Sequence, residues 1–371
     1  MYDCLGGTMA QIKKEKNGWS IRISWRDRTG KLHQKYKSGF AKKADAKKEV
    51  LQLENDLIKG AKLDKNPTFA EYFKKWYEIY RKPYISKITQ KHYDIQLKLV
   101  NEFFKDTPLR NIKRIEYQKA LNIIGKRYSP STTSKISGAF RACIKSAILD
   151  GLISNDITFN AVVNGNKNKV RKVEYLNLEE IKKLLHLAIE SRNPKFVSNY
   201  IIVVGILTGA RIGEILALTW EDIDFTDKTI SINKTWDYHF KSGTKPPKTP
   251  SSVRTITINQ KLCDLLKELQ QNDSKYVFKT KTRNIPSTNG VNKCLNRLLA
   301  ELKIHKKGFH FHSLRHAHVA ILLFKGIDIY NISKRLGHTD ISITTNTYAY
   351  LLDEFKKKTD KKINSIMDNM M

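Results

Sequence analysis

The stretch "LTGARIGEILALTWEDID", residues 207–224, contains a helix end, a helix start and a charged pair within a few positions. The apolar run before it is expected to stop at Gly209, since glycine commonly ends a helix. Arg211 then stands where a new helix begins, and Glu214 follows three residues later, so both side chains share one helical face. An arginine–glutamate pair of this kind is usually an exposed ion pair of little energetic value. The rest of the chain decides whether it belongs to a site.

The segment "PPKTPSSVRTITI", residues 246–258, combines a proline pair and a serine pair with a β-branched run. It predicts a hairpin loop with Lys248 near its tip, followed by a strand that begins at Val253. A loop lysine is usually only solvated, but beside an anion it can deliver a proton to a leaving oxygen.

The segment "FHFHSLRHAH", residues 309–318, places four histidines around Arg315. His312 and His316 lie one helical turn apart, a spacing that zinc ligands often have. Imidazoles beside a guanidinium also suit an anion, so this segment alone leaves a zinc site and an anion site open.

The segment "ISKRLGHTDISITTNTYAYL", residues 332–351, predicts a short helix that ends at Leu336 and turns at Gly337. His338 stands just beyond that turn. Tyr348 and Tyr350 follow in a threonine-rich stretch before a lysine-rich C-terminal segment.

The composition points to a polyanionic partner. With 68 Lys and Arg against 36 Asp and Glu, the 371-residue chain carries a formal charge of +32. Nucleic acid is favoured over an anionic membrane, because no basic amphipathic anchor is recognisable and the longest apolar run, residues 200–207, is too short to span a bilayer. Scattered cysteines without a CxxC pair, and a start without signal-peptide features, predict a reducing cytoplasm.

The N-terminal segment predicts a small sheet packed on one helix. Large apolar residues occupy every second position of one strand, as in a half-buried strand: Trp19, Ile21, Ile23 and Trp25. After a turn at Thr29-Gly30, a second set is expected to continue the inward face: Leu32, Gln34 and Tyr36. Residues 41–59 form the predicted helix. The outer face is basic, and we assign three residues to DNA contact, with a merely solvated face as the alternative: Arg22, Arg26 and Lys35.

The middle of the chain predicts an all-helical unit. After the break "DKNPT", Thr68 and Glu71 form a capping box that opens a helix over residues 69–80. Further helices are expected over residues 89–104, 115–124 and 130–150, before a polar linker at 164–176. An ordinary bundle with solvated lysines is the alternative to half of a DNA clamp.

Five of these elements, in this order, resemble the signature of the tyrosine recombinase (phage integrase) family. They are "TGARIGE", a hairpin "KT..S.R.I", "HSLRH", "LGH" and a tyrosine ten residues after that last histidine. The resemblance covers residues from about 173 to the end and extends more loosely to the two preceding units. It implies a multidomain chain: a small α+β arm-binding domain of a three-stranded sheet plus a helix (9–62), an all-α core-binding domain (67–164), and a mixed, mainly α catalytic domain with a small β-sheet (174–371).

The resemblance also implies roles for seven residues. Tyr348 would be the nucleophile and Glu214 a supporting residue, and five residues would surround the scissile phosphate: Arg211, Lys248, His312, Arg315 and His338. The chemistry fits these residue types, because a five-coordinate phosphorus carries extra negative charge that planar guanidiniums grip with two hydrogen bonds each. Histidines, whose pKa lies near neutral pH, and a lysine can transfer protons to and from the phosphate and leaving-group oxygens.

Within this signature the histidines serve an anion, and the guanidiniums beside them would repel zinc. We therefore expect neither a metal nor another cofactor, and a structural role for His316. His310 and His318 fall outside the signature and are expected to pack or face solvent. Tyr350 stands where many relatives have a histidine, but its spacing from His338 favours Tyr348 as the nucleophile.

We therefore expect a DNA integrase that forms a 3′-phosphotyrosine and integrates or excises a phage or conjugative transposon. Its partners would be double-stranded attachment-site DNA, three further protomers, and accessory bending or directionality proteins. The four protomers would exchange DNA strands through a Holliday junction. It would act in the cytoplasm of a bacterial host. A type IB topoisomerase and a DNA-binding protein without catalysis are the alternatives, and a metal-dependent integrase would lose activity in EDTA.

Overall fold

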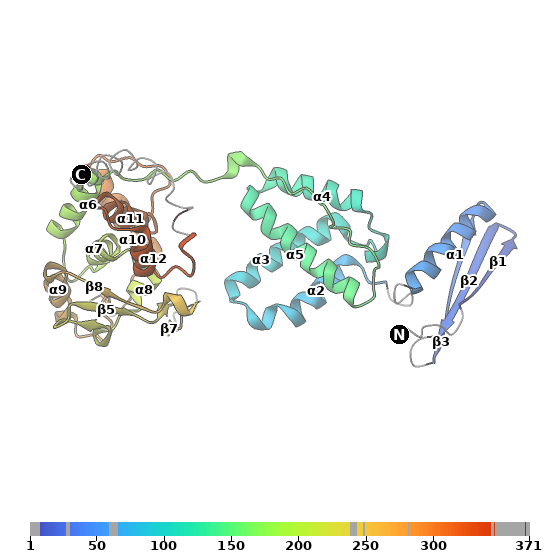
Figure 1. Ribbon diagram of the computed structural model, residues 1–371, viewed down its shortest axis with the longest axis horizontal. Helices are drawn as coiled ribbons and strands as arrows, with labels where there is room; N and C mark the ends of the chain where they lie inside the picture. The colour runs from blue at the N-terminus through green and yellow to red at the C-terminus, as the bar shows by residue number, and fades with distance from the viewer. Residues whose placement is uncertain are drawn as a thin grey trace. The chain divides into compact units, whose positions relative to one another are not determined.

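The computed structural model describes residues 8–26, 30–58, 66–237, 243–247, 249–280, 282, 284–342, 345 and 368. The chain divides into two compact units, Met1–Val170 and Arg171–Met371 (Figure 1). The boundary lies inside the predicted linker. None of the described helices is long and apolar enough to cross a membrane.

The first unit begins with a three-stranded antiparallel sheet, in the order β1 (Met9–Glu15), β2 (Gly18–Arg26), β3 (Leu32–Phe40). Helix α1 (Lys43–Ile58) covers one face of it. The core between sheet and helix is small and consists of six buried residues: Ile21, Ile23, Trp25, Ala46, Val50 and Leu53. The predicted sheet and helix, and the inward face of β2, are confirmed.

The inward face predicted for β3 is wrong. Antiparallel pairing places Ile23 opposite Lys35 and Arg22 opposite Tyr36, and residues directly opposite one another point to the same face. Lys35 therefore lies on the helix-covered side and is half-buried, whereas Tyr36 is 52% exposed beside Arg22. Because Arg26 pairs with Leu32, five residues connect the two strands. The number of connecting residues determines which residues of β3 face the helix, since a shift by one residue would move every side chain to the other face.

The remainder of the first unit is a helical bundle with its own core. Its helices are α2 (Phe69–Tyr80), α3 (Lys87–Phe104), α4 (Arg114–Arg127) and α5 (Pro130–Leu149). The predicted capping box opens α2, since the Glu71 amide donates to Thr68 Oγ1 over 3.2 Å and the Thr68 amide donates to Glu71 Oε2 over 2.8 Å. Phe69, Phe73 and Phe140 meet edge to face at the centre. The predicted all-helical unit is confirmed.

The second unit is mainly helical and is built around one apolar helix, α7 (Ser198–Thr208). Three helices pack against α7: α6 (Leu178–Glu190), α10 (Thr288–Glu301) and α11 (Ser313–Phe324). The shorter helices are α8 (Ile212–Leu216), α9 (Gln260–Lys267) and α12 (Ile329–Leu336). Apolar residues surround the axis of α7, and most of its residues are buried, as expected for a helix at the centre of a domain.

Among its described residues, the second unit also contains two small antiparallel sheets, where one was expected. The first has the order β4 (Ile223–Asp224), β5 (Thr229–Ile232), β8 (Arg254–Thr257), and the second pairs β6 (Thr235–Trp236) with β7 (Thr244–Lys245). Short 3-10 helices connect several elements: Lys82–Tyr84, Leu109–Asn111, Lys167–Lys169, Trp220–Asp222, Pro250–Ser252 and Glu268–Asn272.

Candidate active site

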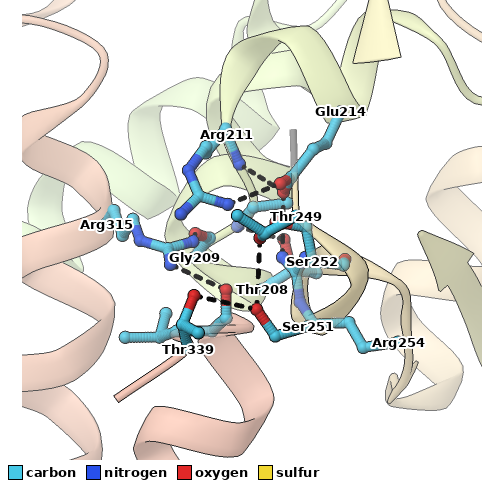
Figure 2. A network of polar contacts seen from close by, with 12 residues as sticks. Thr208, Gly209, Arg211, Glu214, Thr249, Ser251, Ser252, Arg254, Arg315 and Thr339 are labelled. Carbon is cyan, nitrogen blue, oxygen red and sulfur yellow. Dashed lines mark hydrogen bonds and ion pairs between the residues drawn. The ribbon is translucent and has the colours of Figure 1, made fainter. Parts of the chain in front are cut away.

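The first side chain of the site stands at the turn between α7 and α8. Gly209 ends α7 in the left-handed conformation, with φ of 65°, and Arg211 occupies the N-cap position of α8. Glu214 accepts from the Arg211 backbone amide over 2.9 Å and from Arg211 Nη1 over 2.8 Å. The Glu214 side chain is only 4% exposed. The pair is therefore a buried anchor for Arg211 rather than an exposed ion pair (Figure 2).

A second arginine holds the same carboxylate. Arg254, the first residue of β8, donates from Nη2 to Glu214 Oε2 over 2.9 Å, and its side chain is 7% exposed. Burial opposes the ionisation of Glu214, but Arg254 and then Arg211 overcome it, so its pKa lies below the usual value. Sequence reasoning counted Arg254 in the hairpin signature but gave it no role. Its place in that signature, at the start of the strand after Lys248, was the signal available in the sequence.

Arg315 joins two helix ends that lie far apart in the sequence. It is 4% exposed on α11 and donates from Nη1 to the Gly209 carbonyl over 2.8 Å and from Nη2 to the Leu336 carbonyl over 2.7 Å. Carbonyls at helix C-termini carry partial negative charge, so they suit a guanidinium. Arg315 thereby brings the turn that carries Arg211 beside the turn that carries His338.

Both predicted histidines sit in a positive field. Gly337 ends α12 with φ of 70°, and His338 follows it, half-buried. Loss of hydration lowers the pKa of His338 to about 4, with Arg315, Arg211 and Arg254 as further causes. Loss of hydration and then Arg315 also lower the pKa of His312. Such a field disfavours another cation and favours a bound anion.

The remaining histidines of the quoted segment divide between packing, for His318 and His316, and an exposed position, for His310. His318 is 3% exposed, hydrogen-bonds the Ile206 carbonyl through Nδ1 over 2.9 Å, and accepts from Arg335 Nε at Nε2 over 3.1 Å. The His316 ring lies 4.8 Å from the Tyr175 ring and 5.9 Å from the His312 ring, measured between centroids. His310 is exposed, with Nδ1 2.9 Å from the Gly308 carbonyl.

The zinc alternative finds no support here. Within the described ranges, no three His, Cys, Asp or Glu side chains come together as a metal ion would need. The His312 and His316 rings lie edge to face, with their centroids 5.9 Å apart.

Three predicted residues lie outside the described residues: Lys248, Tyr348 and Tyr350. The described neighbours of Lys248 do reach the site. Ser251 Oγ lies 3.1 Å from Thr339 Oγ1, so the segment after Lys248 is tied to the residue that follows His338 (Figure 2). The structure thus brings together Arg211, Glu214, Arg315 and His338, with His312 beside Arg315.

Sequence models of three families match successive parts of the chain. The phage integrase family matches residues 174–354, an arm DNA-binding domain matches 11–57, and the N-terminal SAM-like domain of phage integrases matches 68–124. The chain belongs to the phage integrase family. It is therefore a tyrosine recombinase, an enzyme that cleaves and rejoins DNA through a 3′-phosphotyrosine intermediate to integrate or excise a mobile element.

Two relatives illustrate how far the phage integrase likeness reaches. The integrase of Staphylococcus phage L54a is 26% identical over 337 residues, which cover 82% of this chain and 94% of that protein. The ICEBs1 integrase of Bacillus subtilis is 32% identical over 219 residues, or 53% of this chain and 56% of that protein.

Solved phage integrase structures share the fold. The Tn1549 transposon integrase in complex with circular intermediate DNA has a TM-score of 0.63 and 17% identity, covering 76% of this chain and 94% of that one. A lambda integrase tetramer bound to a Holliday junction has a TM-score of 0.56 and 20% identity, covering 91% and 97%.

Proposed function

We propose that Tyr348 of this integrase attacks a phosphodiester that Arg211, Arg315, His312 and His338 hold. The observation that carries the proposal is the convergence of Arg211, Arg315 and the His338 turn, which come from three separate segments, on one positive and half-buried place. Glu214 keeps Arg211 in place from inside the protein.

The reaction is a transfer of one phosphoester bond. The Tyr348 hydroxyl gives its proton to a neutral histidine of the site as its oxygen attacks phosphorus, a 3′-phosphotyrosine forms, and the bond from phosphorus to the 5′ oxygen breaks. Lys248 gives its proton to the departing 5′ oxygen, and the reverse steps rejoin a DNA end. The two guanidiniums neutralise the charge of the five-coordinate phosphorus, the place where fixed donors help catalysis most. Bond energy is kept in the phosphotyrosine, so the chemistry needs neither metal nor nucleotide.

The three parts of the chain would divide the work. We assign residues 9–62 to arm-type DNA, residues 67–164 to the core site as one half of a clamp, and residues 174–371 to catalysis. A tetramer on a Holliday junction is the assembly seen for lambda integrase, and we propose four protomers on two double-stranded attachment sites here. Accessory proteins that bend DNA or set direction, and a bacterial cytoplasm, complete the proposal.

The decisive experiment is trapping on a nicked suicide substrate that carries candidate element ends. The cleaved strand loses a short piece, which prevents rejoining, so a covalent protein–DNA adduct should accumulate in the presence of EDTA. A protein that binds these ends without an adduct would be a DNA-binding protein only. A type IB topoisomerase would instead relax plasmids that lack attachment sites.

A further inference from the structure

Arg254 contacts three segments of the catalytic unit at once. Nη2 donates to Glu214 Oε2 on α8 over 2.9 Å, Nε donates to the Arg335 carbonyl on α12 over 2.7 Å, and Nη1 donates to the Ser252 carbonyl over 2.9 Å. With its side chain 7% exposed, it is placed to hold protein groups rather than DNA.

Each of these segments carries one part of the proposed site. Glu214 anchors Arg211, the Arg335 carbonyl lies three residues before His338, and Ser252 ends the 3-10 helix Pro250–Ser252, which begins two residues after Lys248. The packing is close at the α12 end, because a Cβ placed on Gly337 would lie 2.9 Å from the Ser251 carbonyl oxygen and 3.1 Å from Arg254 Cδ. The Pro250–Ser252 helix and the His338 turn therefore pack against each other beside Arg254.

We propose that Arg254 is a positioning residue that fixes the separation between the Arg211 side chain, the His338 turn and the Pro250–Ser252 helix. This inference rests on the proposed function, since it concerns the geometry of the same phosphate site. Arg254 does not touch the phosphate in this scheme. It acts through Glu214 and through two backbone carbonyls.

Only a planar guanidinium satisfies all three acceptors together. The acceptors lie in three directions around Arg254, and its Nε, Nη1 and Nη2 donors point outward in a fixed fork. A lysine keeps the charge opposite Glu214, but its single nitrogen cannot span three acceptors at separate places. Arg254→Lys is therefore a test of positioning that leaves the buried carboxylate paired.

A plain contribution to folding is the competing explanation, and the chain offers a matched control. Arg192 also pairs with a glutamate, donating to Glu268 over 2.7 Å and 2.9 Å, and also donates to a backbone carbonyl, that of Ile189, over 2.8 Å. Its described partners include none of the residues of the proposed site. Arg192→Lys should therefore cost stability without changing catalysis.

The experiment compares wild type, Arg254→Lys and Arg192→Lys in full-length protein by single-turnover cleavage of the suicide substrate, DNA affinity and urea unfolding. We expect Arg254→Lys to bind DNA as wild type does but to cleave about 100-fold more slowly, the cost of a displacement near 1 Å in an active site. Arg192→Lys should cleave at the wild-type rate. Equal cleavage by Arg254→Lys and wild type, or equal losses in both variants, would overturn the proposal.

A second readout applies to the charge-removing variant Arg254→Gln. Arg254 is among the cations that lower the pKa of His338, so NMR titration of the histidine rings should show a higher pKa for His338 in Arg254→Gln than in Arg254→Lys. An unchanged pKa with wild-type cleavage in Arg254→Lys would assign Arg254 to folding alone. If wild type itself forms no adduct, the proposed function fails, not this inference.

Discussion

The buried guanidinium of Arg315 donates a 2.8 Å hydrogen bond to the carbonyl oxygen of Gly209, 106 residues earlier in the chain. That single contact fixes Arg315 against Gly209, which stands two residues before Arg211. The two arginines proposed to hold the phosphate therefore lie side by side. It also explains why the end of α7 matters to chemistry, although α7 itself contributes no reacting group.

Arg315→Lys should cleave the suicide substrate about 100- to 1000-fold more slowly, the usual cost of one lost transition-state donor. Lysine keeps the charge but cannot donate to Gly209, Leu336 and a phosphate together. Arg211→Lys should behave alike, with DNA affinity in gel shifts close to wild type for both. Near wild-type cleavage by both variants would exclude the phosphate-clamp interpretation.

Gly209→Ala should destabilise the protein by about 1–3 kcal/mol, because a Cβ is strained at φ of 65° and meets close neighbours. That Cβ would lie 2.8 Å from His318 Cδ2 and 2.9 Å from Leu336 Cδ2. Urea unfolding measures the loss. Gly290→Ala is the control, since its nearest neighbour would be Ser287 Oγ at 3.4 Å, an ordinary contact. Equal stability of the two variants would contradict this account.

Acid should weaken the fold through His318. Burial lowers the pKa of His318 to about 3, with Arg335 as a further cause. The unfolded chain takes up this proton below about pH 6.5 and the folded chain does not, so stability is full above that pH and falls below it.

Between pH 7.5 and pH 5.0, His318 should account for about 2 kcal/mol of lost stability, at about 1.4 kcal/mol per pH unit below 6.5. His318→Gln should therefore lose about 2 kcal/mol less than wild type over this range in urea unfolding. The exposed His310→Gln is the control and should lose as much as wild type. An unchanged pH dependence in His318→Gln would show that His318 is not the titrating group.

Tyr348→Phe should abolish the covalent adduct while DNA affinity stays close to wild type, because only the attacking oxygen is removed. Tyr350→Phe should still form the adduct, as seen by denaturing gel electrophoresis with labelled DNA. Peptide mapping of the wild-type adduct completes the test. DNA attached at Tyr350 would reverse the assignment of the nucleophile.

The strand pairing of the N-terminal sheet separates Arg22 from Lys35, because the two side chains lie on opposite faces. Arg22→Ala, on the open face of β2, should weaken binding to arm-site DNA and reduce the salt slope of log K by about 0.9, one phosphate contact. Lys35→Ala, on the helix-covered side, should change that slope less.

Removal of the arm domain extends the same test. A fragment that starts at Pro67 should still cleave core DNA but lose binding to distal arm sites. A fragment that binds long attachment DNA with the affinity and salt slope of the full chain would rule out the arm assignment.

Local patterns in the sequence predicted the elements well, since caps, glycine turns and residue alternation act between neighbours. The capping box at Thr68, the left-handed ends at Gly209 and Gly337, and the buried side of β2 are all found in the structure. The five signature segments identified the family, because their residue types and order reflect one chemistry.

Tertiary structure decided how these segments meet. The phase of β3 depended on a five-residue connection whose length no local pattern specifies. The contacts of Arg254 with Glu214 and of Arg335 with His318 join residues 40 and 17 positions apart. Arg315 reaches Leu336 across 21 positions and Gly209 across 106. A buried guanidinium must find an acceptor for its donors wherever the packed helices leave a carbonyl free, and only the completed fold determines which carbonyls those are.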